Sequence, residues 1–584
     1  MKKPTKLMAL ALAALTIAPN FVACGDQGGI DIDPEKTQLY IGNYDGGMGH
    51  VWLDHLVKGF EEKYATTSFE KDKTGVQIIV ENSKDLGGAT LISTMSSKKN
   101  ELYFTESAVY YEFINAGLLL DITDVLTTPQ ADDGNKTIES KMNDVQQAYF
   151  KTEEDKYYAV PHYAGYTGII YDIDLFNEKE LFIAKNGAPS EKLQDGGSFK
   201  MYRFTNAEGE KSAGPDGKYG TTDDGLPATY DEFFKLCDEM VKKQVTPFVY
   251  TGQYPTYTNW FLTALQADYE GPEELSAILN LDGSTAKDIL KIQKSANGQY
   301  TDDRSGDKFN IVEAGDVELT NQNGYMMFAQ KGKLEALRFM ERVFSNPSYY
   351  YNSCIGSTFS HRAAQSAFLL NGIGTSAEQP IAFLLDGIWW EEEATADFEY
   401  AAAKFGSQYS KANRNIGLMP LPKADESKIG EGVTVMDLNK TTIFISSKIA
   451  KKKVELAKMF LAYSCSDEAL RDFTTTTYCP KALTYDMGDD YDNLNSYGKN
   501  IWNVYKDASY MLHYSGNVIY RNALADVNIY ASNTTDYSQH LINFLCPALA
   551  GSTKISAETA FKNIVEYQHH AAEGWKVKMK NYLK

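Results

Sequence analysis

The sequence has few cysteines, and their spacing does not indicate a metal site or a disulfide framework. Only six of the 584 residues are Cys. With Cys24 set apart for the reason given below, an odd number remains, none at metal-ligand spacing: Cys237, Cys354, Cys465, Cys479 and Cys546. This pattern excludes a zinc module and a small disulfide-rich scaffold. Cys237 falls on an apolar helix face and is predicted to be a core residue.

Positive charge and long apolar runs are also scarce. The formal net charge is −21, so the surface repels phosphate backbones and nucleic acid is not an expected partner. Beyond the N-terminal segment, no run approaches the ~20 apolar residues that a membrane-spanning helix needs. A phosphate-binding G-x-x-x-x-G-K-[ST] loop is missing as well. The length of 584 residues predicts two or more domains.

The first 24 residues have the pattern of a bacterial lipoprotein signal. Three lysines within the first six residues precede an apolar run, Leu7–Ala18, that is too short to span a bilayer stably. Phe21-Val22-Ala23-Cys24-Gly25 then resembles a lipobox, with Phe21 where Leu is preferred. We expect residues 1–23 to be a signal peptide and Cys24 to carry acyl chains, palmitate among them, on the outer side of the cell membrane. Residues 24–36 would form a flexible tether; the alternative is an ordinary secretory signal with a chance cysteine.

The rest of the chain alternates between strand and helix patterns, which is typical of an α/β fold with mostly parallel sheets. Strands are predicted over 38–42, 76–80, 102–104 and 168–171, and helices over 51–64, 83–96, 230–240 and 452–463, from apolar runs and helical spacing. Thr229 and Glu232 form a capping box at the start of the third helix. Residues 187–227 and 270–325 break the pattern and are predicted to be insertions, with a helix or two within 275–292.

Seven segments occur in the order found in one known family. They resemble its first strand-loop-helix, its crossover strand and its C-terminal helices: LYIGNYDGGMGHVWLDHLVKGFEEKY, ELYFTESAVYYEFINAGLLLDITDVL, VPHYAGYTGIIYDIDLF, ATYDEFFKLCDEMVKK, AFLLDGIWWEEEA, NIGLMPLPK and TTIFISSKIAKKKVELAKMFLAYSCSDEAL. The chain therefore resembles the family 1 extracellular solute-binding proteins, the carbohydrate-binding group of ABC importers that includes maltose-binding protein. The chain is longer than the family norm, which leaves the identity of the ligand open.

The resemblance implies a receptor without enzymatic activity, built from two lobes with the ligand cleft at the hinge. Residues 37–163 and 437–512 would form the first lobe, and residues 164–436 and 513–584 the second. The protein would capture a sugar or oligosaccharide and deliver it to permease subunits in the membrane, with a cytoplasmic ATPase acting indirectly. A monomer is expected, and no cofactor.

Sugars present hydroxyl groups and flat apolar faces, so a sugar site needs aromatic rings together with carboxylates or amides. The order of the family motifs predicts such groups at four places: Tyr44 in the loop after the first strand, Glu106 after the third strand, Tyr257 and Trp260 near the start of a helix, and Asp386, Trp389 and Trp390 after a late strand. An aromatic pair near the hinge, Tyr163 and Tyr166, is a further candidate. Trp389 resembles the main stacking platform of the family, and adjacent tryptophans point apart, so that one of the pair can pack inward.

The segment 214–225 is rich in Asp and Gly and could form an oxygen cage for a structural calcium ion. Asp216, Asp223 and Asp224 are the candidate ligands. The spacing does not match an EF-hand, and Asp-Gly pairs also form simple turns.

Other functions remain open at this stage. A secreted glycosidase needs two carboxylates across a sugar site, and Glu106 with Glu391 is a candidate pair. A dinucleotide site is suggested by Asp45–Gly49, but Trp52 replaces the third glycine of its motif. A peptide or an uncommon polyol is the alternative ligand for an aromatic cleft. His540, His569 and His570 could suggest metal capture, although they lack cluster spacing.

Overall fold

The computed structural model describes residues 31–580, except 186–187, 193–197, 202, 375, 523–554 and 568–569. The expected signal peptide, the lipid-attachment residue Cys24, His540 and His569 lie outside the described residues. In the described part of the chain, none of the helices combines the length and apolar character that crossing a bilayer requires.

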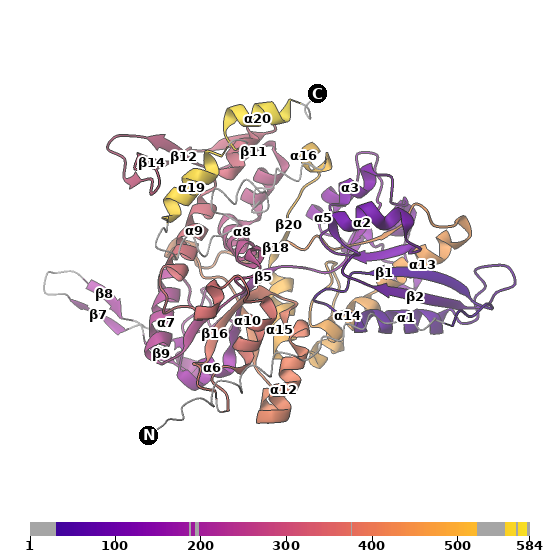
Figure 1. Ribbon diagram of the computed structural model, residues 1–584, viewed down its shortest axis with the longest axis horizontal. Coiled ribbons are helices and arrows are strands. Elements are labelled where there is room, and N and C mark those ends of the chain that lie inside the picture. Colours follow the sequence, from indigo (N-terminus) through magenta and orange to yellow (C-terminus); the bar gives the residue numbers. More distant parts are fainter. Residues whose placement is uncertain are drawn as a thin grey trace, which may run out of the picture.

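The first lobe is built on a five-stranded sheet of order β2-β1-β3-β19-β4. Its strands are β1 (Thr37–Asn43), β2 (Val76–Asn82), β3 (Leu102–Thr105), β4 (Val160–Pro161) and β19 (Thr442–Ile445). Its main helices are α1 (Val51–Lys63), α2 (Gly88–Thr94), α3 (Tyr110–Asn115), α4 (Thr123–Thr127), α5 (Asp144–Phe150), α13 (Val454–Ser464) and α14 (Asp467–Thr477). Figure 1 shows α1 and α14 on one face of this sheet and α2 and α3 on the other. The strands and helices predicted for this half are confirmed.

The second lobe is built on a four-stranded sheet of order β10-β16-β5-β17. Its strands are β5 (Thr167–Asp172), β10 (Thr246–Val249), β16 (Ile381–Gly387) and β17 (Ile416–Met419). Its main helices are α6 (Ile173–Lys179), α7 (Tyr230–Lys242), α8 (Pro255–Asn280), α9 (Lys331–Phe344), α10 (His361–Leu370), α11 (Trp390–Glu393), α12 (Thr395–Phe405) and α15 (Ser496–Asp507). α7 buries Phe233, Leu236, Cys237 and Met240, as its helical spacing predicts.

Both sheets are mixed rather than mostly parallel. β1 runs parallel to β2 and β3, and β10 runs parallel to β16. β19 is antiparallel to β3 and β4, and β5 is antiparallel to β16 and β17. The antiparallel strands adjoin the segments where the chain passes between the lobes, so they enter each sheet from the opposite direction to the βα units.

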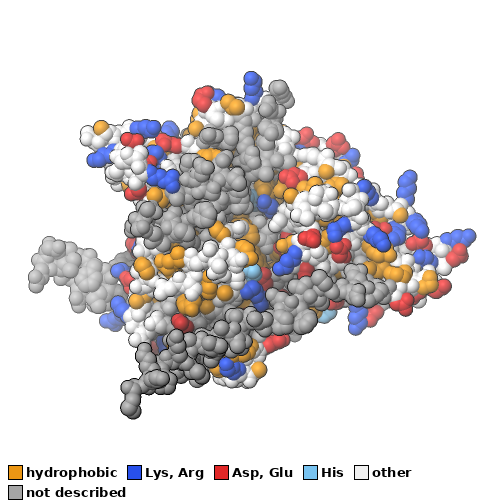
Figure 2. All heavy atoms as spheres, in the orientation of Figure 1, with side chains coloured by type: hydrophobic (Ala, Val, Ile, Leu, Met, Phe, Trp, Pro, Cys, Tyr) orange, Lys and Arg blue, Asp and Glu red, His pale blue; other side chains and the backbone are white. Residues whose placement is uncertain are grey.

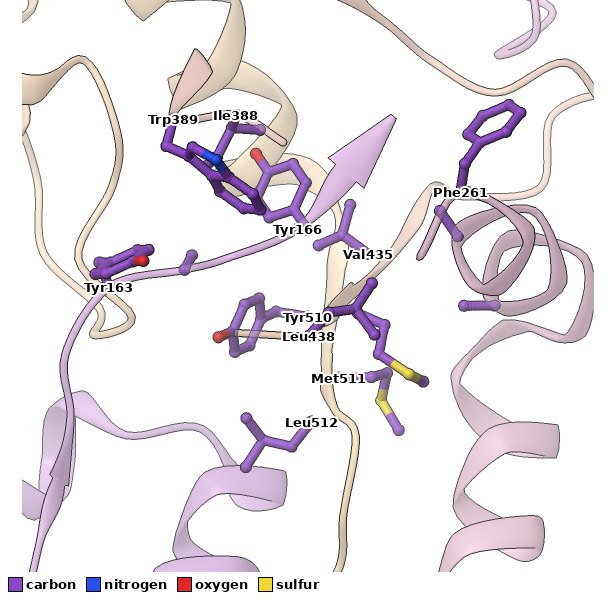
Figure 3. Close-up of a cluster of buried hydrophobic side chains, with 14 of the residues drawn as sticks. Tyr163, Tyr166, Phe261, Ile388, Trp389, Val435, Leu438, Tyr510, Met511 and Leu512 are labelled. Carbon is purple, nitrogen blue, oxygen red and sulfur yellow. The ribbon is translucent and has the colours of Figure 1, made fainter. Parts of the chain in front are cut away.

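Two further strands lie between the lobes and pair in parallel: β18 (Thr434–Asp437) and β20 (Ser509–Leu512). Figure 3 shows their side chains packed in one cluster with Tyr166 on the crossover segment from β4 to β5. We call the crossover residues 162–166 and the pair β18–β20 the hinge segments.

The placement of α15 corrects one expected boundary. Residues 437–512 are assigned to the first lobe from the sequence, but α15 packs against β17 in the second. Asn500 Oδ1 accepts a hydrogen bond from the Leu418 amide at 2.6 Å, and the Tyr497 hydroxyl donates to the Ile388 carbonyl at 2.7 Å. The second lobe thus contains a helix from beyond the second passage through the hinge.

Both predicted insertions contain small antiparallel sheets. β6 (Phe182–Ile183) pairs with β9 (Phe204–Thr205), and β7 (Ala188–Lys192) pairs with β8 (Ser198–Met201) in a hairpin that projects from the body (Figure 1). β11 (Asp282–Ala286) pairs with β15 (Val317–Thr320), and β14 (Lys308–Glu313) pairs with β12 (Leu290–Lys294) and β13 (Tyr300–Thr301). The helix expected within 275–292 ends at Asn280, because Leu281 adopts a left-handed conformation with φ of 49°. α16 (Val518–Arg521), α19 (Ala557–Val565) and α20 (Ala572–Met579) complete the described chain, and α19 packs on α9.

Candidate ligand-binding cleft

Trp389 lies where the two lobes meet. It follows β16 of the second lobe, and its indole is supported by the backbone of Gly387 on the same strand. A Cβ atom added to Gly47, in the loop after β1 of the first lobe, would overlap the indole of Trp389. Trp389 is only 5% exposed. One aromatic side chain therefore contacts both lobes directly.

A row of aromatic rings extends from Trp389 along the second lobe. The ring of Trp260 lies 5.8 Å from that of Trp389 in an edge-to-face arrangement, and Tyr257 lies 5.5 Å from Trp260. His361 stacks on Tyr257 at 5.8 Å, and Tyr254 lies 5.4 Å beyond His361. Tyr257 and Trp260 share one face of the first turn of α8 because they are three residues apart. The row ends at Tyr254, which is 42% exposed, at the surface.

Carboxylates of the second lobe lie beside these rings. Gln365 on α10 donates through Nε2 to Asp386 Oδ2 at 3.0 Å and to Glu393 Oε2 at 2.7 Å. Asp386 is buried, and burial followed by the nearby Glu393 raises the pKa of its carboxyl well above the ordinary value. Burial also raises the pKa of the Tyr257 hydroxyl, with Asp386 and Glu393 adding to the effect, so this hydroxyl remains a hydrogen-bond donor at neutral pH.

The first lobe contributes Glu106 and Tyr44. Glu106 Oε1 accepts a hydrogen bond from the Tyr163 hydroxyl at 2.6 Å, and that hydroxyl accepts from Asn439 Nδ2 at 3.1 Å. Burial raises the pKa of Glu106 to about 7, the Tyr163 hydrogen bond opposes the shift, and the charge of Glu393 from the other lobe adds to it. Burial, then Glu106 and then Glu393 also raise the pKa of Tyr44. The polar groups of both lobes thus act on one another across the cleft.

Gly46 lets the first-lobe loop fold closely over these groups. A Cβ atom on Gly46 would lie 2.6 Å from Tyr44 Cε1 and 2.7 Å from Glu106 Oε1. Since real Cβ atoms do not approach other atoms so closely, this position requires glycine. Gly46 and Gly47 thus make room for Tyr44, Glu106 and Trp389.

The structure brings most of the predicted site residues together at the contact between the lobes and places Trp390 outside it. Seven of them lie around the interlobe contact: Tyr44, Glu106, Tyr163, Tyr257, Trp260, Asp386 and Trp389. Trp390 is fully buried against Phe368, Phe398 and Tyr497, so its predicted ligand role is wrong. The side chain follows Trp389 directly and points the opposite way, into the second-lobe core.

Tyr166 is 1% exposed and packs in the hinge cluster beside Ile388 and Trp389 (Figure 3). Its hydroxyl is buried without a hydrogen-bond partner. Trp52, which follows the first-lobe loop, is 2% exposed and packs on Phe104, His162 and Phe473, so it belongs to the first-lobe core.

Glu391, the second carboxylate considered for a glycosidase, is buried in another environment. Its oxygens accept from Asn495 Nδ2 at 3.1 and 3.3 Å, and burial raises its pKa to about 8. The carboxylate that faces the aromatic row is Glu393, which the sequence did not single out, and a pairing of Glu106 with Glu391 across a sugar has no support in this geometry.

The calcium site expected at Asp216, Asp223 and Asp224 is wrong. Across the described residues, no group of three or more His, Cys, Asp or Glu side chains is arranged to hold a metal ion. The carboxylates accept hydrogen bonds from their own turn instead: Asp223 from the Asp216 amide at 2.9 Å, and Asp224 from the Gly220 amide at 2.8 Å. The Asp-Gly segment is a turn stabilised by side-chain acceptors.

Three residues of the cleft were missed from the sequence: Gln365, Glu393 and His361. Gln365 and His361 lie on α10, which packs against β16. The order of the sheet brings them to Asp386, and no local motif marks them. Glu393 lies in the segment after Trp389 that the family pattern covers, and the spacing from Trp389 by one helical turn is the signal that could have identified it.

A two-lobed α/β protein whose lobes meet at an aromatic and acidic cleft has the architecture of a solute receptor. The family model of bacterial extracellular solute-binding proteins matches residues 65–495. The chain belongs to this family of receptors. A search of curated proteins found no match.

Solved structures share the fold at low sequence identity. The GacH receptor of Streptomyces glaucescens is 14% identical, with a TM-score of 0.50 over 94% of this chain and 99% of that chain. RafE from Streptococcus pneumoniae is 14% identical, with a TM-score of 0.51 over 91% of this chain and 97% of that chain. A chitin oligosaccharide binding protein is 14% identical, with a TM-score of 0.51 over 92% of this chain and 100% of that chain. At this identity, these likenesses establish the fold.

Proposed function

We propose that the protein is the extracytoplasmic receptor of an ABC importer and that it captures an oligosaccharide between its lobes. The observation that carries the proposal is the meeting of Trp389 from one lobe with the Gly46–Gly47 loop, Tyr44 and Glu106 from the other. A sugar ring needs an aromatic face on one side and acceptors for its hydroxyls at the edges. Structures of the same fold include one described as a chitin oligosaccharide binding protein, which supports a saccharide as the ligand class.

The mechanism follows from the arrangement of the lobes. We propose that they move about the hinge segments, with residues 37–163 and most of 437–495 in the first lobe and the remainder in the second. A ligand that contacts Trp389 and Glu106 at the same time makes its full set of contacts only when the lobes are closed. It therefore shifts the population toward the closed form by its differential affinity. The closed form would then dock on permease subunits, and a cytoplasmic ATPase would drive uptake.

The remaining assignments of the sequence belong to the same proposal. Cys24 would carry the lipid that holds the receptor at the outer face of the cell membrane, and the protein would act as a monomer without hydrolysing its ligand. Radiolabelled palmitate that is incorporated into the wild type and not into Cys24→Ser would support the anchor.

The experiment that tests the receptor function is a calorimetric titration of the purified protein, residues 31–584, with a panel of neutral and amino oligosaccharides. We expect at least one to bind with micromolar or tighter affinity. Small-angle scattering with that ligand should show a smaller radius of gyration than for the free protein. Binding of short peptides or polyols, with no oligosaccharide bound, would contradict the proposal.

A further inference from the structure

The acidic corner of the cleft, formed by Asp386 and Glu393, presents hydrogen-bond acceptors. Asp386 Oδ2 and Glu393 Oε2 share a single donor, the Nε2 of Gln365. The other amide atom of Gln365, Oε1, is buried without a hydrogen-bond partner, and the residue is 0% exposed. A ligand that fits this part of the cleft must therefore supply hydrogen-bond donors.

Among the described residues, no Lys or Arg lies within ion-pair distance of the cleft carboxylates, although Arg362 acts on Asp386 and Lys84 on Glu106 from further away. In the described part of the chain, the one ion-pair contact of Glu106, Asp386 and Glu393 is His361 Nε2, 4.0 Å from Glu393 Oε2. Burial lowers the pKa of His361 below its ordinary value. The charge of Glu393 opposes this shift, and the charges of Arg362 and Lys84 add to it. At neutral pH this imidazole is therefore mainly uncharged, and among the described residues the carboxyl groups have no charged partner within ion-pair distance; the raised pKa values of Glu106 and Asp386 reflect burial first and the nearby Glu393 as well.

Some buried carboxylates of the protein have close cationic partners, whereas Asp437 and Glu391 accept hydrogen bonds from Tyr510 and Asn495 instead. Asp172 Oδ2 lies 2.7 Å from an Arg414 nitrogen, and Asp268 Oδ2 lies 2.9 Å from Lys423 Nζ. The cleft carboxylates belong with the second group, because no Lys or Arg lies within ion-pair distance of them in the described part of the chain. Figure 2 shows Lys or Arg and Asp or Glu side chains interspersed over the first-lobe part of the visible face.

The aromatic rings of the cleft are suited to a cation. Tyr257, Trp260 and Trp389 lie beside Asp386 and Glu393, and the faces of such rings attract ammonium groups. A metal ion is not the expected cation, because the described residues contain no cluster of three or more metal-ligating side chains. An ammonium group supplies positive charge and three donors in one small unit.

We infer that the cleft recognises an oligosaccharide that carries a protonated amine, such as a chain of glucosamine units. The ammonium group would bind between Asp386, Glu393 and the aromatic rings, while the sugar rings stack on Trp389 and its neighbours. The inference depends on the proposed function as a saccharide receptor and names the chemical class of saccharide.

The amine would also favour closure of the lobes. Glu106 belongs to the first lobe and Glu393 to the second, and each charge acts on the other across the cleft. Ionising both carboxyl groups in the closed, empty cleft is unfavourable, and the pKa of Glu106 is raised to about 7 by burial and by Glu393. A cation bound between them turns this repulsion into attraction and thus binds the closed form with preference.

The test compares three ligands by calorimetry: the tetramer of glucosamine, its N-acetylated counterpart, and a glucose tetramer. The first two share a backbone and differ in the charge at the amino group. We expect the glucosamine tetramer to bind at least ~10-fold more tightly than the other two at pH 6, where it is protonated. Glu393→Gln should reduce this preference at least ~5-fold. Glu392→Gln is the matched control, since Glu392 pairs with Lys411, and it should keep the preference.

The outcomes separate the inference from the proposed function. Equal or tighter binding of the N-acetylated or glucose tetramer overturns the inference and leaves the receptor function standing. A preference for the amine that survives in Glu393→Gln overturns the assigned position of the ammonium group. If circular dichroism shows a folded protein and no oligosaccharide of any kind binds, the inference and the proposed function both fail.

Discussion

The indole of Trp389 lies directly against Gly47, although the two residues belong to different lobes. The structure therefore represents an arrangement in which the lobes touch and the first-lobe loop covers Trp389. The absence of a side chain at Gly47 permits this contact. Any larger residue would have to displace the indole or separate the lobes.

The first prediction concerns this contact. In Gly47→Val, the valine side chain would occupy the space of the Trp389 indole, and we expect the lobes to remain apart. Scattering should show a radius of gyration that no longer decreases with ligand, and affinity should fall at least ~10-fold. Gly209→Val is the control, because a Cβ atom there meets no neighbour within 4 Å, and it should behave like the wild type. Normal compaction of Gly47→Val would contradict this arrangement of the lobes.

The second prediction separates the two adjacent tryptophans. Trp389→Ala removes a ring from the cleft and should weaken oligosaccharide binding at least ~10-fold. Trp390→Ala removes a fully buried ring from the second-lobe core and should lower the free energy of unfolding by about 3–5 kcal/mol. Calorimetry and urea denaturation on both variants check the prediction. Unchanged affinity in Trp389→Ala would exclude it as a stacking residue.

The third prediction follows from Glu106. Its pKa is raised to about 7, mainly by burial. The hydrogen bond from Tyr163 opposes this shift, and the charges of Glu393 and Asp437 add to it. Between the ordinary carboxyl pKa of 4.5 and about 7, the folded protein therefore binds more protons at this site than the unfolded chain, and this contribution to stability decreases as pH rises.

We expect Glu106→Gln to remove this pH-dependent loss of stability, because the glutamine side chain does not titrate. Its oxygen can still accept the hydrogen bond from Tyr163. Its stability relative to the wild type should increase between pH 5 and pH 8 and change little below that window. Urea denaturation at both pH values measures the difference, with exposed Glu62→Gln as the control. A difference independent of pH would show that Glu106 titrates normally.

The fourth prediction concerns a buried lysine beside the hinge. Lys481 Nζ lies 2.6 Å from His162 Nδ1 and 4.3 Å from the ring centre of Phe473. Burial lowers its pKa from 10.5 to about 7. Between these values the unfolded chain binds the additional proton, so the contribution of Lys481 to stability increases as pH rises from about 7 toward 10.

We expect Lys481→Met to stabilise the protein at pH 7 by on the order of a few kcal/mol, with a gain that shrinks toward pH 10. Denaturation of the variant and the wild type across this range checks the trend. The exposed Lys58→Met should show no such trend, and a constant difference for Lys481→Met would contradict the lowered pKa.

Local features of the fold could be predicted where a short segment determines its own structure. Thr229 caps α7 as its pattern indicates, with its hydroxyl accepting from the Glu232 amide at 3.3 Å. The strands β1 to β3 follow from apolar runs. The pairing within the second insertion could not be predicted, because its short strands pair only with one another, although LKIQK and VELT alternate apolar and polar residues.

The cleft residues likewise divide into those that a local sequence pattern predicts and those that it does not. Trp389, Tyr257 and Trp260 were found because they occupy segments with a family pattern. Gln365 and Glu393 were missed because their meeting at Asp386 depends on α10 packing against β16, which local sequence does not specify. The contact between Trp389 and Gly47 depends on the relative position of the two lobes, which no short segment of the sequence determines.

The parallel pair β18–β20 has a mechanical consequence. A single connecting strand would let the lobes twist as well as bend, but two strands joined by hydrogen bonds resist twisting more strongly. The crossover segment between β4 and β5 adds a further constraint. We therefore expect the lobes to rotate about a single axis. The aromatic row and the first-lobe loop would then return to the same relative position after each cycle of uptake.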